Sequence, residues 1–110
     1  MGMTTAVCAR THNEDFWANV LCFRNYYYLS ADLRELGIIH GKLDKDQAKI
    51  IYRYLGAHFF EIAKRERGYW GMGWWRSIFV QLKRRQCMRY LIQHWDEFEE
   101  VEYYDDYTSP

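Results

Sequence analysis

Residues 44–62 read DKDQAKIIYRYLGAHFFEI, and this stretch carries the clearest helical periodicity in the chain. The apolar positions that fall within one arc of a helical wheel are Ala48, Ile51, Tyr52, Leu55, Phe59 and Ile62. Asp44 has a side chain suited to an N-cap, and Gly68 is suited to end the helix. Gly56 lies inside the pattern at a cost of about 1 kcal/mol relative to alanine. We therefore expect one continuous amphipathic helix between Asp44 and Gly68.

A helix-turn-helix motif is the alternative for the same stretch, with its turn at residues 55–57. That motif needs a small residue where the chain has Tyr52, and an apolar residue where the chain has Arg65. The continuous helix therefore explains these residues better.

Two shorter helical segments are expected before this helix. Thr11 and Glu14 have the spacing of a capping box. The apolar stripe that follows at helical spacing comprises Phe16, Val20, Phe23 and Tyr27. Ser30 offers a second N-cap, for a short helix over residues 31–36. Residues 37–42 are expected to form a short extended piece, and we find no strongly alternating strand.

The last helix is expected to run from about Trp74 to Phe98, and its apolar residues change sides near residues 83–86. The first cluster comprises Trp75, Ile78, Phe79 and Leu82. The second cluster lies roughly half a turn away and comprises Met88, Leu91, Ile92, Trp95 and Phe98. Either the helix breaks between the clusters, or one long helix buries opposite faces against different neighbours. The second option predicts a homo-oligomer that forms through the last helix.

Together these segments predict an all-α fold, a small bundle of three to four helices with a glycine-aromatic loop and an acidic C-terminal tail. The length of 110 residues fits one domain. We expect residues 1–98 to form this helical domain and residues 99–110 to form an acidic, tyrosine-rich tail. The one proline, Pro110, leaves the helices unbroken.

Cysteine usage and hydropathy predict a soluble, cytoplasmic protein that makes no membrane contact. The three cysteines are an odd, widely spaced set, which argues against a disulfide framework. The N-terminus lacks the layout of a signal peptide. No apolar run approaches the ~20 residues that span a bilayer.

Charge is unevenly distributed along the chain, although the formal net charge is zero. Residues 1–63 carry 7 basic and 7 acidic side chains. Residues 64–89 carry 8 basic and 1 acidic, a balance of +7, and residues 90–110 carry 7 acidic and no basic, a balance of −7. Such segments create local fields even when the total charge vanishes.

Aromatic residues make up 19% of the chain, more than a domain of this size can hide. Exposed rings and clustered carboxylates favour binding to a protein partner. The residues expected to make that contact are Tyr69, Trp70, Trp74, Glu99, Glu100, Glu102, Tyr103, Tyr104, Asp105, Asp106 and Tyr107. Three roles remain open for the tail: mimicry of nucleic acid toward a partner, folding back on the basic segment, or a merely solubilising end.

The leading alternative function is a nucleic-acid-binding module in residues 76–89 together with the aromatic loop. Cations near exposed rings suit a single strand, whose phosphates meet the cations while its bases stack on the rings. The candidate contacts are Arg76, Lys83, Arg84, Arg85 and Arg89.

Motifs for catalysis, metal binding or cofactor binding are missing from the sequence. We therefore expect a non-enzymatic protein without cofactor or metal that binds another protein, such as a nucleic-acid-binding complex. Its size and charge layout suit a small inhibitor or adaptor, in the style of a phage or mobile-element protein that acts on a host complex in the host cytoplasm.

Overall fold

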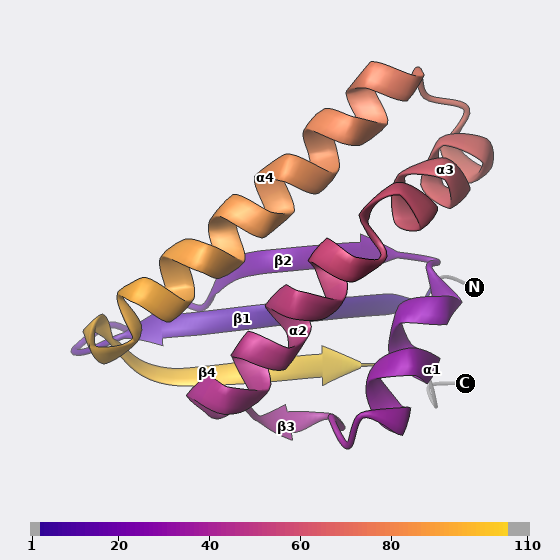
Figure 1. Cartoon of the computed structure of the whole chain (residues 1–110). Helices are drawn as coiled ribbons and strands as arrows, with labels where there is room; N and C mark the ends of the chain where they lie inside the picture. The colour runs from indigo at the N-terminus through magenta and orange to yellow at the C-terminus, as the bar shows by residue number, and fades with distance from the viewer. Residues whose placement is uncertain (1–2, 106–110) are drawn as a thin grey trace.

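The computed structural model describes residues 3–105, which form an α/β fold and not the expected all-α helical bundle. Four antiparallel strands form one sheet in the order β2-β1-β4-β3, and the helices lie along one of its faces (Figure 1). The elements in chain order are β1 (Thr4–Thr11), β2 (Ala18–Arg24), α1 (Tyr27–Glu35), β3 (Gly41–Lys42), α2 (Lys45–Ala57), α3 (Phe59–Trp70), α4 (Trp74–Gln93), η1 (Trp95–Glu97) and β4 (Phe98–Asp105).

The N-terminal residues form a β-hairpin of β1 and β2 where a capped helix was expected. Alternate residues of the two strands, Thr5, Val7, Ala9, Leu21 and Phe23, are buried, and Ala6 is buried as well. Thr11 is the last residue of β1 and Glu14 lies in the connection to β2, where the Glu14 N–H donates to the Thr11 carbonyl at 3.4 Å. The helical reading was wrong because it followed apolar residues spaced three and four apart, whereas pairing of β2 with β1 and packing on the core select every second residue.

The segment expected to be an acidic tail is in part strand β4, which lies inside the sheet between β1 and β3. Val101 and Tyr103 are buried in the core, and they alternate with the half-buried Glu100 and Glu102. The prediction of a tail over this segment was wrong because alternation with period two, not overall charge, decides whether a segment can cover a core.

The helix predicted between Asp44 and Gly68 is interrupted at His58, where the backbone leaves helical geometry (φ −109°, ψ 23°) and separates α2 from α3. The predicted cap is confirmed, because Asp44 and Gln47 form a capping box at the start of α2. The predicted end at Gly68 was wrong, because α3 continues to Trp70 and Gly71, whose φ of 66° suits glycine, is its C-cap. The extended piece is confirmed at β3, and the last helix is continuous but ends at Gln93.

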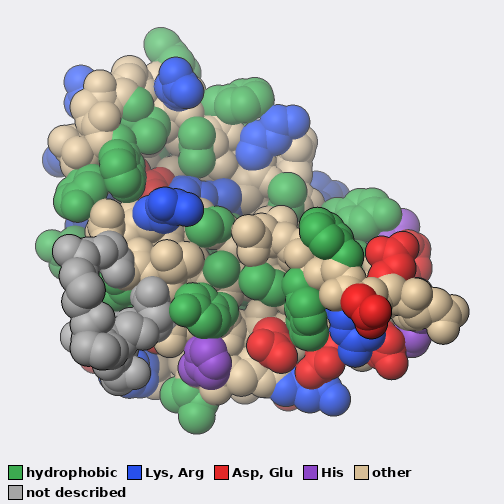
Figure 2. Space-filling model, turned by 180° about the vertical axis from the view of Figure 1, so that it is seen from behind, with side chains coloured by type: hydrophobic (Ala, Val, Ile, Leu, Met, Phe, Trp, Pro, Cys, Tyr) green, Lys and Arg blue, Asp and Glu red, His purple; other side chains and the backbone are tan. Residues whose placement is uncertain are grey.

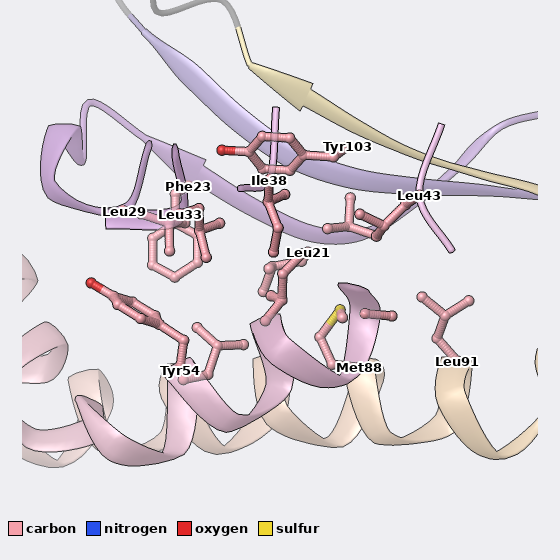
Figure 3. Packing of buried hydrophobic residues seen from close by; sticks show 14 of the residues in the cluster. Leu21, Phe23, Leu29, Leu33, Ile38, Leu43, Tyr54, Met88, Leu91 and Tyr103 are labelled. Carbon is pink, nitrogen blue, oxygen red and sulfur yellow. The ribbon is translucent and has the colours of Figure 1, made fainter. Parts of the chain in front are cut away.

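The hydrophobic core lies between the sheet and the helices (Figure 3). Phe23 and Tyr103 from the sheet meet Tyr54 of α2 and Met88 of α4 within one buried cluster. Only the C-terminal half of α4 covers the sheet in this way. Its N-terminal half and α3 extend past the edge strand β2 (Figure 1), so this half of α4 must find its buried neighbours elsewhere.

Two buried tyrosines predict that the fold loses stability at alkaline pH. Burial, and then the hydrogen bond donated to Asp32, raise the pKa of Tyr54 above its ordinary value of 10. Burial also raises the pKa of Tyr103. The folded state therefore favours both neutral phenols, a stabilisation that is complete below pH 10 and declines above it, by about 1.4 kcal/mol per tyrosine at pH 11.

Thermal unfolding at pH 8 and pH 11 measures this loss. The double variant Tyr54→Phe/Tyr103→Phe has neither phenol to ionise, so its melting temperature should fall less between the two pH values than that of the parent chain. An equal fall in both proteins would show that other groups cause the alkaline loss.

Candidate interaction surfaces

The N-terminal half of α4 packs on α3 through buried polar side chains. The Ser77 hydroxyl donates to the Ala63 carbonyl at 2.6 Å, and the Gln81 amide donates to the Glu66 carboxylate at 2.6 Å. Glu66 and Gln81 are each only 3% exposed. A buried carboxylate is stable only when paired and hydrogen-bonded. This pairing therefore fixes which face of α4 points inward.

Arg84 completes this polar cluster and ties it to the sheet. Its guanidinium pairs with Glu66, donates to the Cys22 carbonyl at 3.0 Å, and lies 3.7 Å above the ring of Phe23. Because Cys22 and Phe23 belong to the edge strand β2, Arg84 joins α3, α4 and the sheet at one point. We call Glu66, Gln81 and Arg84 the polar cluster.

The outward face of the same helix carries large apolar side chains. Trp75 is 79% exposed, Phe79 58% and Leu82 49%. Their spacing of four and three residues places them in one row on α4. We call these three residues the apolar stripe. Ordinary amphipathic helices bury such residues, so in this half of α4 the usual arrangement is inverted.

The aromatic loop expected to bind a partner lies next to this surface, at the α3–α4 turn. Tyr69 and Trp70 are exposed and contact each other edge to face, with ring centroids 5.0 Å apart. Trp74 is half-buried at the start of α4. The structure thus places part of the predicted loop site beside the apolar stripe.

The rim of the apolar stripe is cationic. Arg76 is exposed, and the Lys83 ammonium lies 5.4 Å from the ring centroid of Phe79. Around it, α2 to α4 carry most of the positive charge, since residues 45–93 hold 11 basic and 3 acidic side chains. The rest of the described chain holds 4 basic and 11 acidic side chains.

This separation of charge is visible from the sheet side. Most Asp and Glu side chains gather around one end of the sheet, whereas Lys and Arg prevail over the end formed by α3 and α4 (Figure 2). Within residues 3–105, the basic and the acidic parts of the chain therefore become two regions of one surface.

The carboxylates of the predicted tail site are engaged inside the fold. Glu99 and Glu100 both pair with Arg10 of β1, at 2.9 and 3.3 Å. Glu102 lies opposite Lys42 of β3 in the strand register. The ion pairs of Glu99 and Glu100 join β4 to β1, which leaves these two carboxylates less available to an outside partner.

The remaining residues of that predicted site divide between core and surface. Tyr103 is buried, whereas Tyr104 is 41% exposed with its ring centroid 5.3 Å from that of His40. Asp105 accepts a hydrogen bond from Ser30 at 2.5 Å. Asp106 and Tyr107 lie outside the described residues.

The five cations of the alternative nucleic-acid site also separate. Arg84 belongs to the polar cluster, and Arg85 is half-buried with its guanidinium 4.6 Å from the ring centroid of Tyr52. Arg76, Lys83 and Arg89 are exposed. The segment 76–89 is therefore not one continuous cationic face.

Nucleophilic and metal-binding groups form no constellation in the described part of the chain. Burial raises the pKa of the Cys8 thiol, which lowers its thiolate fraction at neutral pH. Between residues 3 and 105, no group of three or more His, Cys, Asp or Glu side chains is arranged to hold a metal ion. No helix in the same range is long and apolar enough to cross a membrane.

Sequence reasoning missed the outward direction of Trp75, Phe79 and Leu82, and the cations Lys49 and Arg53 of α2. The change of apolar side along α4 was a signal for the first three, but the position of the sheet decides which side is buried. Comparison of the chain with protein-family models, curated proteins and solved structures gave no match.

Proposed function

We propose that the chain is a non-enzymatic protein-binding protein, an adaptor or inhibitor that docks through the apolar stripe on α4. One observation carries the proposal: three large apolar side chains stand in a row on the outside of a helix whose inward face is held by the polar cluster. Burying each such side chain contributes roughly 1.5–3 kcal/mol. Contiguous exposed apolar surface of this kind marks interaction sites.

The cationic rim indicates the chemistry of the partner. Arg76 and Lys83 flank the apolar stripe, and the described part of α4 contains no acidic residue. A partner surface that is apolar at its centre and acidic at its edge would complement both features. Two copies of α4 face to face would bring like charges together, so we favour a different protein over a second copy.

The polar cluster supports the proposal because it makes the exposed stripe a fixed feature. Rotating α4 to bury Trp75 and Phe79 would separate Arg84 from Glu66 and leave a buried carboxylate unpaired. The stripe is therefore presented in one orientation before any partner arrives, which reduces the entropic cost of binding.

A capture experiment with two matched triple variants tests the proposal. The stripe variant is Trp75→Gln/Phe79→Gln/Leu82→Gln, and the control removes equally exposed apolar side chains elsewhere, in Phe16→Gln/Leu36→Gln/Ile39→Gln. Proteins captured by the parent chain should be lost with the stripe variant and retained with the control. Each captured protein must then be purified and shown to bind the parent chain again. A captured protein that the stripe variant binds as well as the parent chain does would contradict the proposal.

Light scattering on the same three proteins tests the homo-oligomer through the last helix that was predicted from the sequence. Like charges around the apolar stripe predict a monomer at low ionic strength. A dimer that forms there in the parent chain and the control, but not in the stripe variant, would identify a second copy of the chain as the partner and overturn the choice of a different protein.

A further inference from the structure

A second surface, between α2 and the C-terminal part of α4, has a different chemistry. Helices α2 and α4 leave a groove of about 420 Å³ between them. The residues that line it are Lys49, Tyr52, Arg53, Arg89, Ile92 and Gln93. Its charged side chains are all cations, and its floor includes a ring and an aliphatic side chain.

Arg85 lies beside this groove in an unusual state for an arginine. Its side chain is half-buried against Tyr52, and its Nε has no hydrogen-bond partner among the described residues. Gly56 makes room for it, because a Cβ at that position would lie 2.9 Å from the Arg85 Nη2 atom. The helix that sequence reasoning treated as weakened by Gly56 therefore uses this glycine to seat a cation.

Carboxylates do not compensate this group of charges. None of the ion pairs formed within residues 3–105 involves Lys49, Arg53, Arg85 or Arg89. Four cations gathered without a counter-charge repel one another, and a partly desolvated arginine favours an anion with several acceptor oxygens. The cations of this groove therefore suit an anionic ligand from outside the chain.

We propose that this α2–α4 groove binds single-stranded nucleic acid through its phosphates. The cations suit a phosphodiester backbone, and the ring of Tyr52 with the adjacent Ile92 offers apolar surface to unpaired bases. A concave groove between two helices admits one strand, whereas a duplex would meet only its rims. This site is separate from the apolar stripe, so the two proposals stand or fall independently.

Fluorescence anisotropy with a labelled 20-nucleotide oligo(dT) at low salt tests the site. The groove variant is Lys49→Gln/Arg53→Gln/Arg89→Gln. The control, Arg24→Gln/Lys64→Gln/Arg67→Gln, removes the same charge from exposed positions outside the groove. We expect the groove variant to bind at least about tenfold more weakly than the parent chain, with little change in the control.

The salt dependence of oligo(dT) binding gives a second readout of the same contacts. Four phosphate contacts on a single strand predict a slope of log K against log salt of about −3, which should fall to about −1 in the groove variant. Tyr52→Leu, which keeps an apolar side chain but removes the ring, should weaken binding about fivefold or more.

Different results would contradict the binding site and the assignment to a single strand. No binding by the folded parent chain at low salt would overturn the site, and so would equal weakening in the groove variant and the control. Duplex DNA of the same length bound as tightly as oligo(dT) would overturn the assignment to a single strand. The stripe variant keeps every cation, so its binding to oligo(dT) should match that of the parent chain whether or not the protein-binding proposal holds.

Discussion

Replacing Tyr103 with alanine is expected to lower the free energy of unfolding by about 3–5 kcal/mol, because the change leaves a cavity in the core. Tyr103 is 1% exposed and packs in the cluster between the sheet and the helices. Its neighbour Tyr104, which is 41% exposed, provides the matched control. Tyr104→Ala should cost less than about 1 kcal/mol. Urea unfolding followed by circular dichroism measures both values.

The contrast between the two tyrosines separates a strand from a tail. In a tail outside the folded domain, both substitutions would leave stability unchanged, and that result would contradict β4. Ending the chain after Phe98 extends the test. It would remove most of β4 and leave the pairing edges of β1 and β3 open, so this shortened chain is expected not to fold.

Replacing Arg84 with methionine is expected to cost about 3–5 kcal/mol, since it leaves the Glu66 carboxylate buried without its cation. The methionine retains most of the apolar stem, so the loss reports mainly on charge. The effect should be far larger than that of Arg76→Met, because Arg76 is exposed on the same helix.

A double variant distinguishes loss of the ion pair from simple loss of packing. Glu66→Gln/Arg84→Met removes the charge but keeps an acceptor oxygen for Gln81, which donates to residue 66 in the parent chain. It should regain at least about half of the stability lost in Arg84→Met. A double variant no more stable than Arg84→Met would show that the contacts of Arg84 with Cys22 and Phe23 dominate instead.

Local signals in the sequence predicted the helix start at Asp44, the extended piece at β3 and the start of the last helix at Trp74, but left open whether that helix is continuous. These features depend on neighbours along the chain, such as the capping box between Asp44 and Gln47. The strands could not be found in the same way. Small and polar residues fill alternate positions of β1, and carboxylates fill those of β4, so neither segment reads as apolar.

The pairing that stabilises these strands is remote in sequence. Arg10 of β1 meets Glu99 and Glu100 of β4 some 90 residues later. A count of charges along the chain assigns Arg10 and the two glutamates to separate segments and does not show that they form ion pairs. This is why the acidic residues seemed available to another molecule.

The polar cluster left one signal that sequence reasoning did not use. Glu66 is the single acidic residue in the basic segment 64–89. A lone carboxylate among eight cations is well placed to become their buried partner, but only the fold shows that Gln81 and Arg84 meet it. Because Gln81 and Arg84 face the interior, Trp75, Phe79 and Leu82 on the other side of α4 face outward.

Docking through the apolar stripe is tested most directly by titration calorimetry with one purified partner. The measurement compares the Kd of this partner for the parent chain, for the stripe variant and for the control Phe16→Gln/Leu36→Gln/Ile39→Gln. Loss of three central apolar contacts should raise the Kd of the stripe variant at least about a hundredfold, while the control stays within about twofold of the parent. An unchanged Kd in the stripe variant, or an equal rise in the control, would contradict the assignment of this surface.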